Sequence, residues 1–287
     1  MRAHTTKSLA GMLAFLVVLV GLPGALSAQW PNYPTPGVPK GPDGKPDLTG
    51  PAPRTADGKP DLSGIWEFVR NRPALPSNAT LGAPPPTPAD AGRIGLEQFF
   101  NIGWTLKDDL PFTPWGKELR ARRFGENSRD NPDAHCLPLG LMQLHTHPQP
   151  RKMIQTSKLM VILYEAQAGV RQIFMDGRPL PVDPNPTWNG YSIGKWEGDA
   201  LVIETNGFRD GQWLDRAGSP LTDRAKVTER LRRVNFGHMQ VDVTVDDPKA
   251  YTKPWTVKLK LFLVPDTDLL DETCLENEKD AGHLIGK

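Results

Sequence analysis

Several common functional signals are missing from this chain of 287 residues. No serine lies in a nucleophile elbow, which argues against Ser-His-Asp catalysis. No phosphate-binding glycine motif precedes a helix, so nucleotide chemistry is not expected and no cofactor is predicted. Excess charge is missing too, because the formal net charge is +1. A near-neutral chain does not attract polyanions over long range, so nucleic acid is not an expected partner.

Cysteine is scarce, with Cys136 and Cys274 the only two. An even count in an oxidising compartment favours a disulfide between them. A reactive thiol is the alternative, but it would need a setting that lowers its pKa and would risk oxidation after export.

Long apolar runs are also rare, and the single one lies at the N-terminus, after the basic residues Arg2 and Lys7. The uncharged residues 8–29 have an apolar centre, then helix breakers and small residues that predict signal-peptide cleavage before Ala28 or Gln29. An uncleaved membrane anchor is the alternative. We expect a periplasmic or secreted protein with no stable membrane insertion after cleavage of the signal peptide, residues 1–28.

Proline is abundant, with 30 residues, so long helices are not expected to dominate. Residues 29–60 are rich in proline, glycine and charge and predict a linker, and residues 61–280 predict one β-rich domain. The octapeptide DGKPDLTG at Asp43–Gly50 recurs as DGKPDLSG at Asp57–Gly64. Turn chemistry explains both copies better than calcium binding, because no closing glutamate follows.

A short helical segment is predicted at residues 88–124, ahead of most of the strands. Pro88 opens a first helix that continues to Asn101, and Thr113 with Pro114 forms an N-cap and first-turn pair for a second helix that ends near Phe124.

Short strands at regular spacing, separated by turn signals, dominate the rest of the chain. The expected strands are residues 65–69, 153–156, 159–166, 170–175, 190–197, 200–205, 226–233, 238–245, 255–263 and 269–274. Residues 239–245 and 255–263 alternate cleanly between apolar and polar side chains, so one face of each strand is buried. The fold class is therefore mainly β, an antiparallel meander closed into a lipocalin-like barrel, with a two-sheet sandwich as the alternative.

Several longer strings place the chain near a known group. These strings are DGKPDLSGIW at Asp57, CLP at Cys136, DGRPLP at Asp176, GYSIGKWEGD at Gly190, DDPKAYTKPW at Asp246 and CLEN at Cys274. Through them the chain resembles a family of exported, largely uncharacterised bacterial proteins over about residues 54–280, and the resemblance implies a single domain but no particular reaction or ligand.

His145 and His147 form a weak candidate metal site. In an extended segment, residues two apart point to the same side, so both imidazoles could hold one Zn²⁺ or Cu²⁺ ion. No third ligand is evident at a recognised spacing, although His135 lies upstream. Exposed loop histidines are the alternative, because prolines follow them.

Glu165 and Arg171 are predicted to face each other across a hairpin whose loop is residues 167–169. The pair is either structural or part of a pocket that orients a polar ligand, together with the neighbouring Tyr164. Trp213, in the long segment 206–224, is a candidate cover for a barrel mouth, and a packed surface loop is the alternative.

Glu229 is the carboxylate that the strand pattern most nearly forces inward, since Val227 and Leu231 share its face. A buried carboxylate needs a partner or has a raised pKa, which makes Glu229 a candidate acid or base. Glu204, expected opposite Ile193, is a second candidate and Glu165 a third. The alternative is that these carboxylates are exposed to solvent at the ends of the barrel.

The leading hypothesis is an exported barrel that binds a small apolar or aromatic molecule in a central cavity. The alternatives are a lyase, isomerase or hydratase that uses the carboxylates for acid/base chemistry, and a cell-envelope interaction module without a small ligand.

Overall fold

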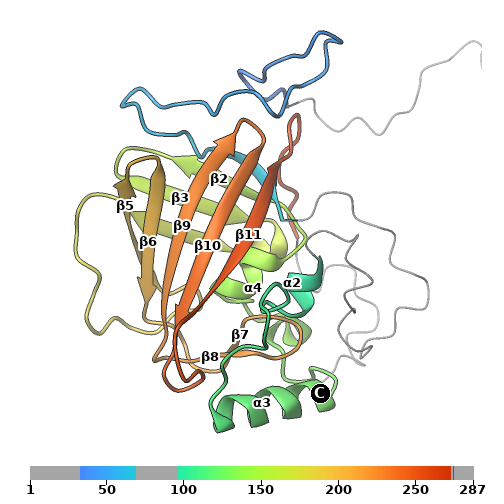
Figure 1. The fold of residues 1–287 in the computed structure, drawn as a ribbon, viewed down its shortest axis with the longest axis vertical. Coiled ribbons are helices and arrows are strands. Elements are labelled where there is room, and N and C mark those ends of the chain that lie inside the picture. Colours follow the sequence, from blue (N-terminus) through green and yellow to red (C-terminus); the bar gives the residue numbers. More distant parts are fainter. Residues whose placement is uncertain (1–32, 69–95, 273, 275–287) are drawn as a thin grey trace, which may run out of the picture. The chain divides into compact units, whose positions relative to one another are not determined.

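Nine β-strands of the computed structural model close into a barrel (Figure 1). The structure describes residues 33–68, 96–272 and 274, and from Pro34 onward these belong to one compact unit. Around the barrel the order is β1 (Gly64–Glu67), β11 (Trp255–Leu263), β10 (His238–Asp246), β9 (Lys226–Asn235), β6 (Ala200–Asn206), β5 (Tyr191–Glu197), β4 (Val170–Phe174), β3 (Leu159–Tyr164) and β2 (Arg151–Gln155).

The expected mainly β, lipocalin-like barrel is confirmed, and the sandwich alternative is not. Alternation along β10 and β11 explains why one face of these strands forms the barrel interior, because every second side chain is apolar and points inward. These inward residues are Met239, Val241, Val243 and Val245 on β10, and Trp255, Val257, Leu259, Leu261 and Leu263 on β11.

The expectation of a purely antiparallel meander is wrong at one position. β4 and β5 pair in parallel through Ile173 with Ser192 and Phe174 with Ile193. Residues 175–190 connect the two strands, long enough for the crossover that a parallel pair requires. The other eight pairs of the barrel are antiparallel.

Short helices and a small hairpin accompany the barrel. None of the helices among the described residues has the length and apolar character needed to cross a membrane. These elements are α2 (Leu96–Phe100), α3 (Pro114–Gly125), η2 (Pro132–His135), α4 (Leu141–Thr146), η3 (Ala166–Ala168), and the two-stranded sheet of β7 (Gln212–Trp213) and β8 (Pro220–Leu221).

The helix signal at Thr113 is confirmed, since its hydroxyl accepts a hydrogen bond from the amide of Gly116 at 3.1 Å, at the start of α3. Of the helix expected at residues 88–101, only α2 falls among the described residues, and residues 88–95 lie outside them. The strand expected at residues 269–274 is wrong over 269–272, where the amide of Leu270 bonds to the carboxylate of Glu165 instead of to a neighbouring strand.

The octapeptide repeat forms the same turn twice. Gly44 donates to the carbonyl of Gly41 at 2.9 Å, and in the second copy Gly58 donates to Thr55 at 2.9 Å. Both glycines have positive φ, 74° and 77°, which explains the shared Asp-Gly.

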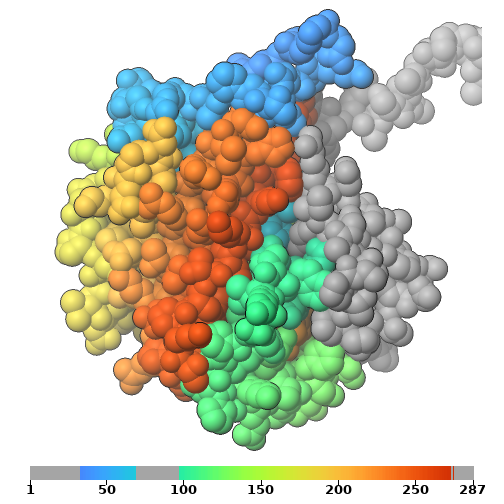
Figure 2. Space-filling model, viewed as in Figure 1, coloured from blue at the N-terminus to red at the C-terminus, as the bar shows by residue number. Residues whose placement is uncertain are grey.

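The repeat also contacts the barrel, although the sequence predicts a linker up to residue 60. The carbonyl of Leu48 accepts from the amide of Gly237, and the carbonyl of Gly50 accepts from Phe236, both at 2.7 Å. Arg54 makes a bidentate pair with Asp199 in the β5–β6 turn. Figure 2 shows this N-terminal segment, in blue, lying against the strand ends.

The expected disulfide is confirmed. Cys136 and Cys274 are bonded at a sequence separation of 138 residues. Cys274 lies beyond β11, so the bond ties the segment after η2 to the chain that follows the barrel.

Candidate ligand site in the barrel interior

Glu229 lies inside the barrel, as the alternation of β9 predicts. Val227, Glu229 and Leu231 are all buried, and the Glu229 side chain is 0 % exposed. Its neighbours across the strands are Ile203 on β6 and Val243 on β10, both apolar. A carboxylate in such a position requires charged or hydrogen-bonding partners from elsewhere in the barrel.

Arg171 on β4 is the main partner. Its Nη1 lies 3.1 Å from Oε1 of Glu229, and its Nη2 contacts Oε2, so the pair is bidentate. The rest of the guanidinium is also used, because Nε donates to the hydroxyl of Ser192 at 3.1 Å and Nη2 to that of Thr205 at 2.9 Å. The two hydroxyls are 3.0 Å apart. The ion pair is therefore held in one geometry by strands β4, β5, β6 and β9.

His145 on α4 is the second partner of the carboxylate. Its Nε2 lies 2.7 Å from Oε1 of Glu229. Arg151 on β2 donates to the carbonyls of His145 at 2.9 Å and His147 at 3.2 Å, and these carbonyls lie at the C-terminal end of α4. A cation there satisfies carbonyls that have no partner within the helix. Arg151 thereby fixes α4 so that His145 faces the barrel interior.

The electrostatics assign different states to these groups. Burial raises the pKa of Glu229, but the charge of Arg171 and the hydrogen bonds from Arg171 and His145 outweigh it and lower that pKa well below its ordinary value. Burial lowers the pKa of His145, against the opposing effect of Glu229. Glu229 is thus a fixed carboxylate that orients its neighbours, and the neutral imidazole is the group able to take up a proton.

Tyr164 on β3 joins the same cluster, as the sequence predicts. It lies directly opposite Arg151, whose guanidinium is 5.7 Å from the centre of its ring, and its ring is 6.4 Å from that of His145. Of the residues predicted to bind a ligand, Arg171 and Tyr164 therefore meet at one end of the barrel.

Two predicted carboxylates lie elsewhere. Glu165 does not face Arg171, because the strand register places Arg171 opposite Ile162 and leaves Glu165 outside the sheet. Glu204 does lie opposite Ile193, as predicted, but it points outward and makes an ion pair of 2.5 Å with Lys226. Neither residue reaches the interior, so both predictions of an acid or base in the cavity are wrong.

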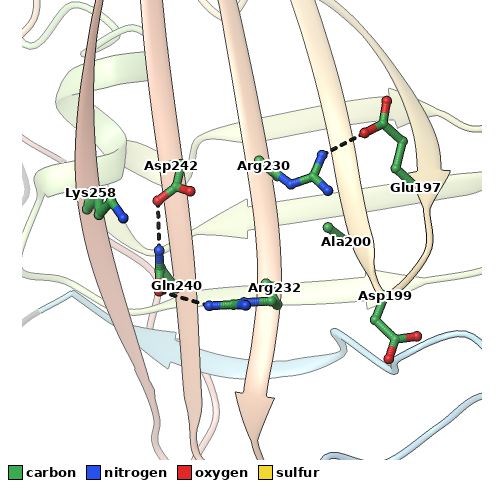
Figure 3. A pocket seen from close by; sticks show the side chains of 8 residues that line it. All are labelled: Glu197, Asp199, Ala200, Arg230, Arg232, Gln240, Asp242 and Lys258. Carbon is green, nitrogen blue, oxygen red and sulfur yellow. Dashed lines mark hydrogen bonds and ion pairs between the residues drawn. The ribbon is translucent and has the colours of Figure 1, made fainter.

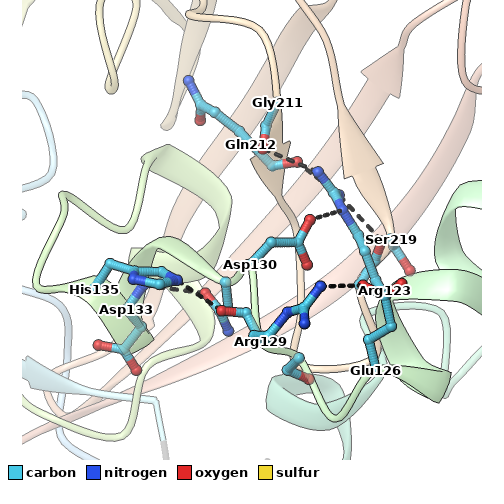
Figure 4. Close-up of polar contacts among 12 residues, drawn as sticks. Arg123, Glu126, Arg129, Asp130, Asp133, His135, Gly211, Gln212 and Ser219 are labelled. Atoms are coloured by element: carbon cyan, nitrogen blue, oxygen red, sulfur yellow. Dashed lines mark hydrogen bonds and ion pairs between the residues drawn. The ribbon is translucent and has the colours of Figure 1, made fainter. Parts of the chain in front are cut away.

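Trp213, the candidate cover for a barrel mouth, is fully buried. It lies on β7, with the guanidinium of Arg123 4.6 Å from its ring centre. That guanidinium donates to the carbonyls of Gly211 and Gln212 (Figure 4) and to the carbonyl of Gly218. The packed-loop alternative therefore holds for segment 206–224.

The two histidines of the predicted metal site do not converge, because residues 141–146 are helical and not extended. His147 packs against the ring of Phe99 while His145 faces Glu229. His135 contacts the carbonyl of Arg129 at 2.7 Å (Figure 4). Across the described ranges, no group of three or more ligating side chains could hold a metal ion.

Ser192, Thr205 and Arg151 are site residues that the sequence analysis missed. Thr205 follows the alternation of Leu201 and Ile203 and could have been placed inward from that pattern. Ser192 is the central residue of GYSIG at Gly190, which has the spacing of a nucleophile-elbow motif, but it lies within strand β5 and not at a strand-to-helix turn. Arg151 offers no comparable signal, because a lone polar residue near a strand end is ordinarily exposed to solvent.

A separate hollow of about 290 Å³ lies on the outer face of the sheet (Figure 3). Its charges largely neutralise one another, since Arg230 pairs with Glu197 at 2.6 Å and Gln240 bridges Arg232 and Asp242. This pattern is that of a solvated sheet face.

Comparison of the chain with protein-family models, with curated proteins and with solved structures finds no match. The assignment of function therefore depends on the geometry of the site.

Proposed function

We propose that the protein is exported to the periplasm or the medium and binds a small molecule with an apolar or aromatic body inside the barrel. The observation that carries this proposal is the buried cluster of Glu229, Arg171 and His145 at one end of an apolar interior. Burying an ion pair often stabilises a fold no better than apolar packing would. A buried cluster of this kind is therefore more readily explained by a role in binding a ligand than by a contribution to the stability of the fold.

The interior is suited to an apolar body. Apolar side chains from several strands of the barrel pack against one another beside the cluster, among them Ile162, Ile203 and Leu259. Met153 and Met160 are also buried there, and methionine side chains re-pack more easily than branched ones. A ligand enters by displacing these flexible side chains.

Titration with the neutral fluorescent probe N-phenyl-1-naphthylamine tests the proposal. We expect saturable binding that is lost in Ile203→Phe, whose extra volume fills the interior, and kept in Val202→Phe, on the outward face of the same strand. Absence of saturable binding to the wild-type protein, or equal binding by both variants, would refute it.

The second candidate is an acid/base enzyme, favoured by the 2.7 Å contact between His145 and Glu229. In this case His145 is the base and Glu229 only orients it. Any compound that co-purifies with His145→Gln would then be converted by the wild-type protein, and an unchanged compound would leave binding as the function.

A further inference from the structure

Two hydrogen-bond donors in the cluster have no acceptor among the described residues. The first is Nε of Arg151, whose other nitrogens donate to the carbonyls of His145 and His147. The second is the hydroxyl of Tyr164, whose oxygen can accept from Arg171 but whose O–H has no acceptor. Both side chains are more than nine-tenths buried. A buried donor without an acceptor is costly, and such groups are rare in native structures.

The two donors lie close together because of the strand register. Arg151 is directly opposite Tyr164 across β2 and β3. Arg171 is the diagonal neighbour of Tyr164 on the other side, since Tyr164 pairs with Gly169 and Arg171 is two residues further along β4. The phenol therefore stands between two guanidinium groups.

The charges at this end of the barrel favour an additional anion. Arg171 is matched by Glu229, while Arg151 makes no ion pair with another described residue and interacts with Glu67 at longer range. Burial lowers the pKa of Arg151 to about 10. An anion beside Arg151 would offset that cost of burial.

Since both open groups are donors, their missing partner is an acceptor. We propose that the ligand carries a carboxylate that docks between Nε of Arg151 and the hydroxyl of Tyr164, with its apolar body in the barrel interior. This inference rests on the proposed function and names the class of ligand, a small apolar or aromatic acid.

The test compares two probes of nearly equal shape, 2-naphthoate and its neutral analogue 2-naphthamide, by displacement of N-phenyl-1-naphthylamine. We expect the wild-type protein to bind the carboxylate at least about tenfold more tightly, because hydrogen bonds to charged groups are stronger than those to neutral ones.

Tyr164→Phe is the informative variant, and Tyr251→Phe is its matched control. Tyr251 is also buried, but its hydroxyl already donates to the carbonyl of Pro220 at 2.8 Å. We expect Tyr164→Phe to weaken 2-naphthoate about tenfold, to weaken 2-naphthamide less, and to lower the melting temperature less than Tyr251→Phe does. Tyr251→Phe should lower the melting temperature and leave both affinities unchanged. Arg151→Lys, which keeps the charge without Nε, should also weaken the carboxylate more than the amide.

The outcomes separate the two proposals. Equal affinities for the two probes, with no effect of Tyr164→Phe, would overturn the carboxylate inference and leave binding in the interior intact. Failure of both probes to displace the dye would overturn it as well. Failure of the dye itself to bind would remove the proposed function, and the carboxylate inference with it.

Discussion

Replacing Glu229 with glutamine should destabilise the protein strongly, because it leaves the Arg171 guanidinium buried without a counter-charge. Both side chains are almost completely buried and their contact is bidentate. Removing one partner of a buried ion pair typically costs about 3–5 kcal/mol. A domain has about 5–15 kcal/mol of unfolding free energy in total. The loss should therefore be about a fifth of the stability or more.

Urea unfolding followed by tryptophan fluorescence, with the disulfide intact, measures this loss. Glu204→Gln is the matched control, since its ion pair with Lys226 lies on the outer face and its side chain is 40 % exposed. That change should cost no more than about 1 kcal/mol. The double variant Arg171→Met/Glu229→Leu should recover most of the stability, because it removes both charges. A Glu229→Gln protein within 1 kcal/mol of wild type would refute the buried ion pair.

Three further predictions concern other parts of the molecule. Burial lowers the pKa of His147 to about 4, so as the pH falls the unfolded chain takes up a proton before the folded chain does. The unfolding free energy should therefore decrease between pH 6.5 and 4, by about 3 kcal/mol from this residue, and urea midpoints for His147→Gln should depend less on pH than those of wild type. Deleting residues 29–52 should lower the melting temperature by about 5 °C, because the amide of Gly237 loses its partner, whereas deletion of a mere linker would be nearly neutral. An unchanged melting temperature in calorimetry would contradict these contacts. Reducing the bond between Cys136 and Cys274 should lower the unfolding free energy by up to about 5 kcal/mol, and equal urea midpoints with and without reductant would count against it.

Most of what could be predicted about the fold follows from the alternation of apolar and polar residues along the strands. Residues 255–263 form β11 as expected, and the strands expected at residues 190–197 and 200–205 correspond to β5 and β6. Helix α4 was not predicted, because all six of its residues are buried and it therefore lacks the one-sided period of a surface helix. The prolines that follow it favour a loop instead.

The site is only partly predictable for a related reason. Alternation places Glu229 inward, but the hairpin that carries Arg171 contains a tight 3-10 turn with Gln167 and Ala168 at positive φ. Such conformations are uncommon for residues other than glycine, so sequence rules do not anticipate them. The resulting register pairs Arg171 with Ile162 and leaves Glu165 outside the sheet, away from the site. His145 joins the site only through α4, which the sequence does not predict.

The most direct test of the central claim is native mass spectrometry of the mature protein, purified from its own host without a denaturing step. We predict a mass above that of the disulfide-bonded polypeptide by one small molecule, which is released on denaturation and carries an acidic group. The same preparation of Tyr164→Phe should retain less of it. A mass equal to that of the bare polypeptide, together with failure to bind added 2-naphthoate, would contradict a ligand site inside the barrel.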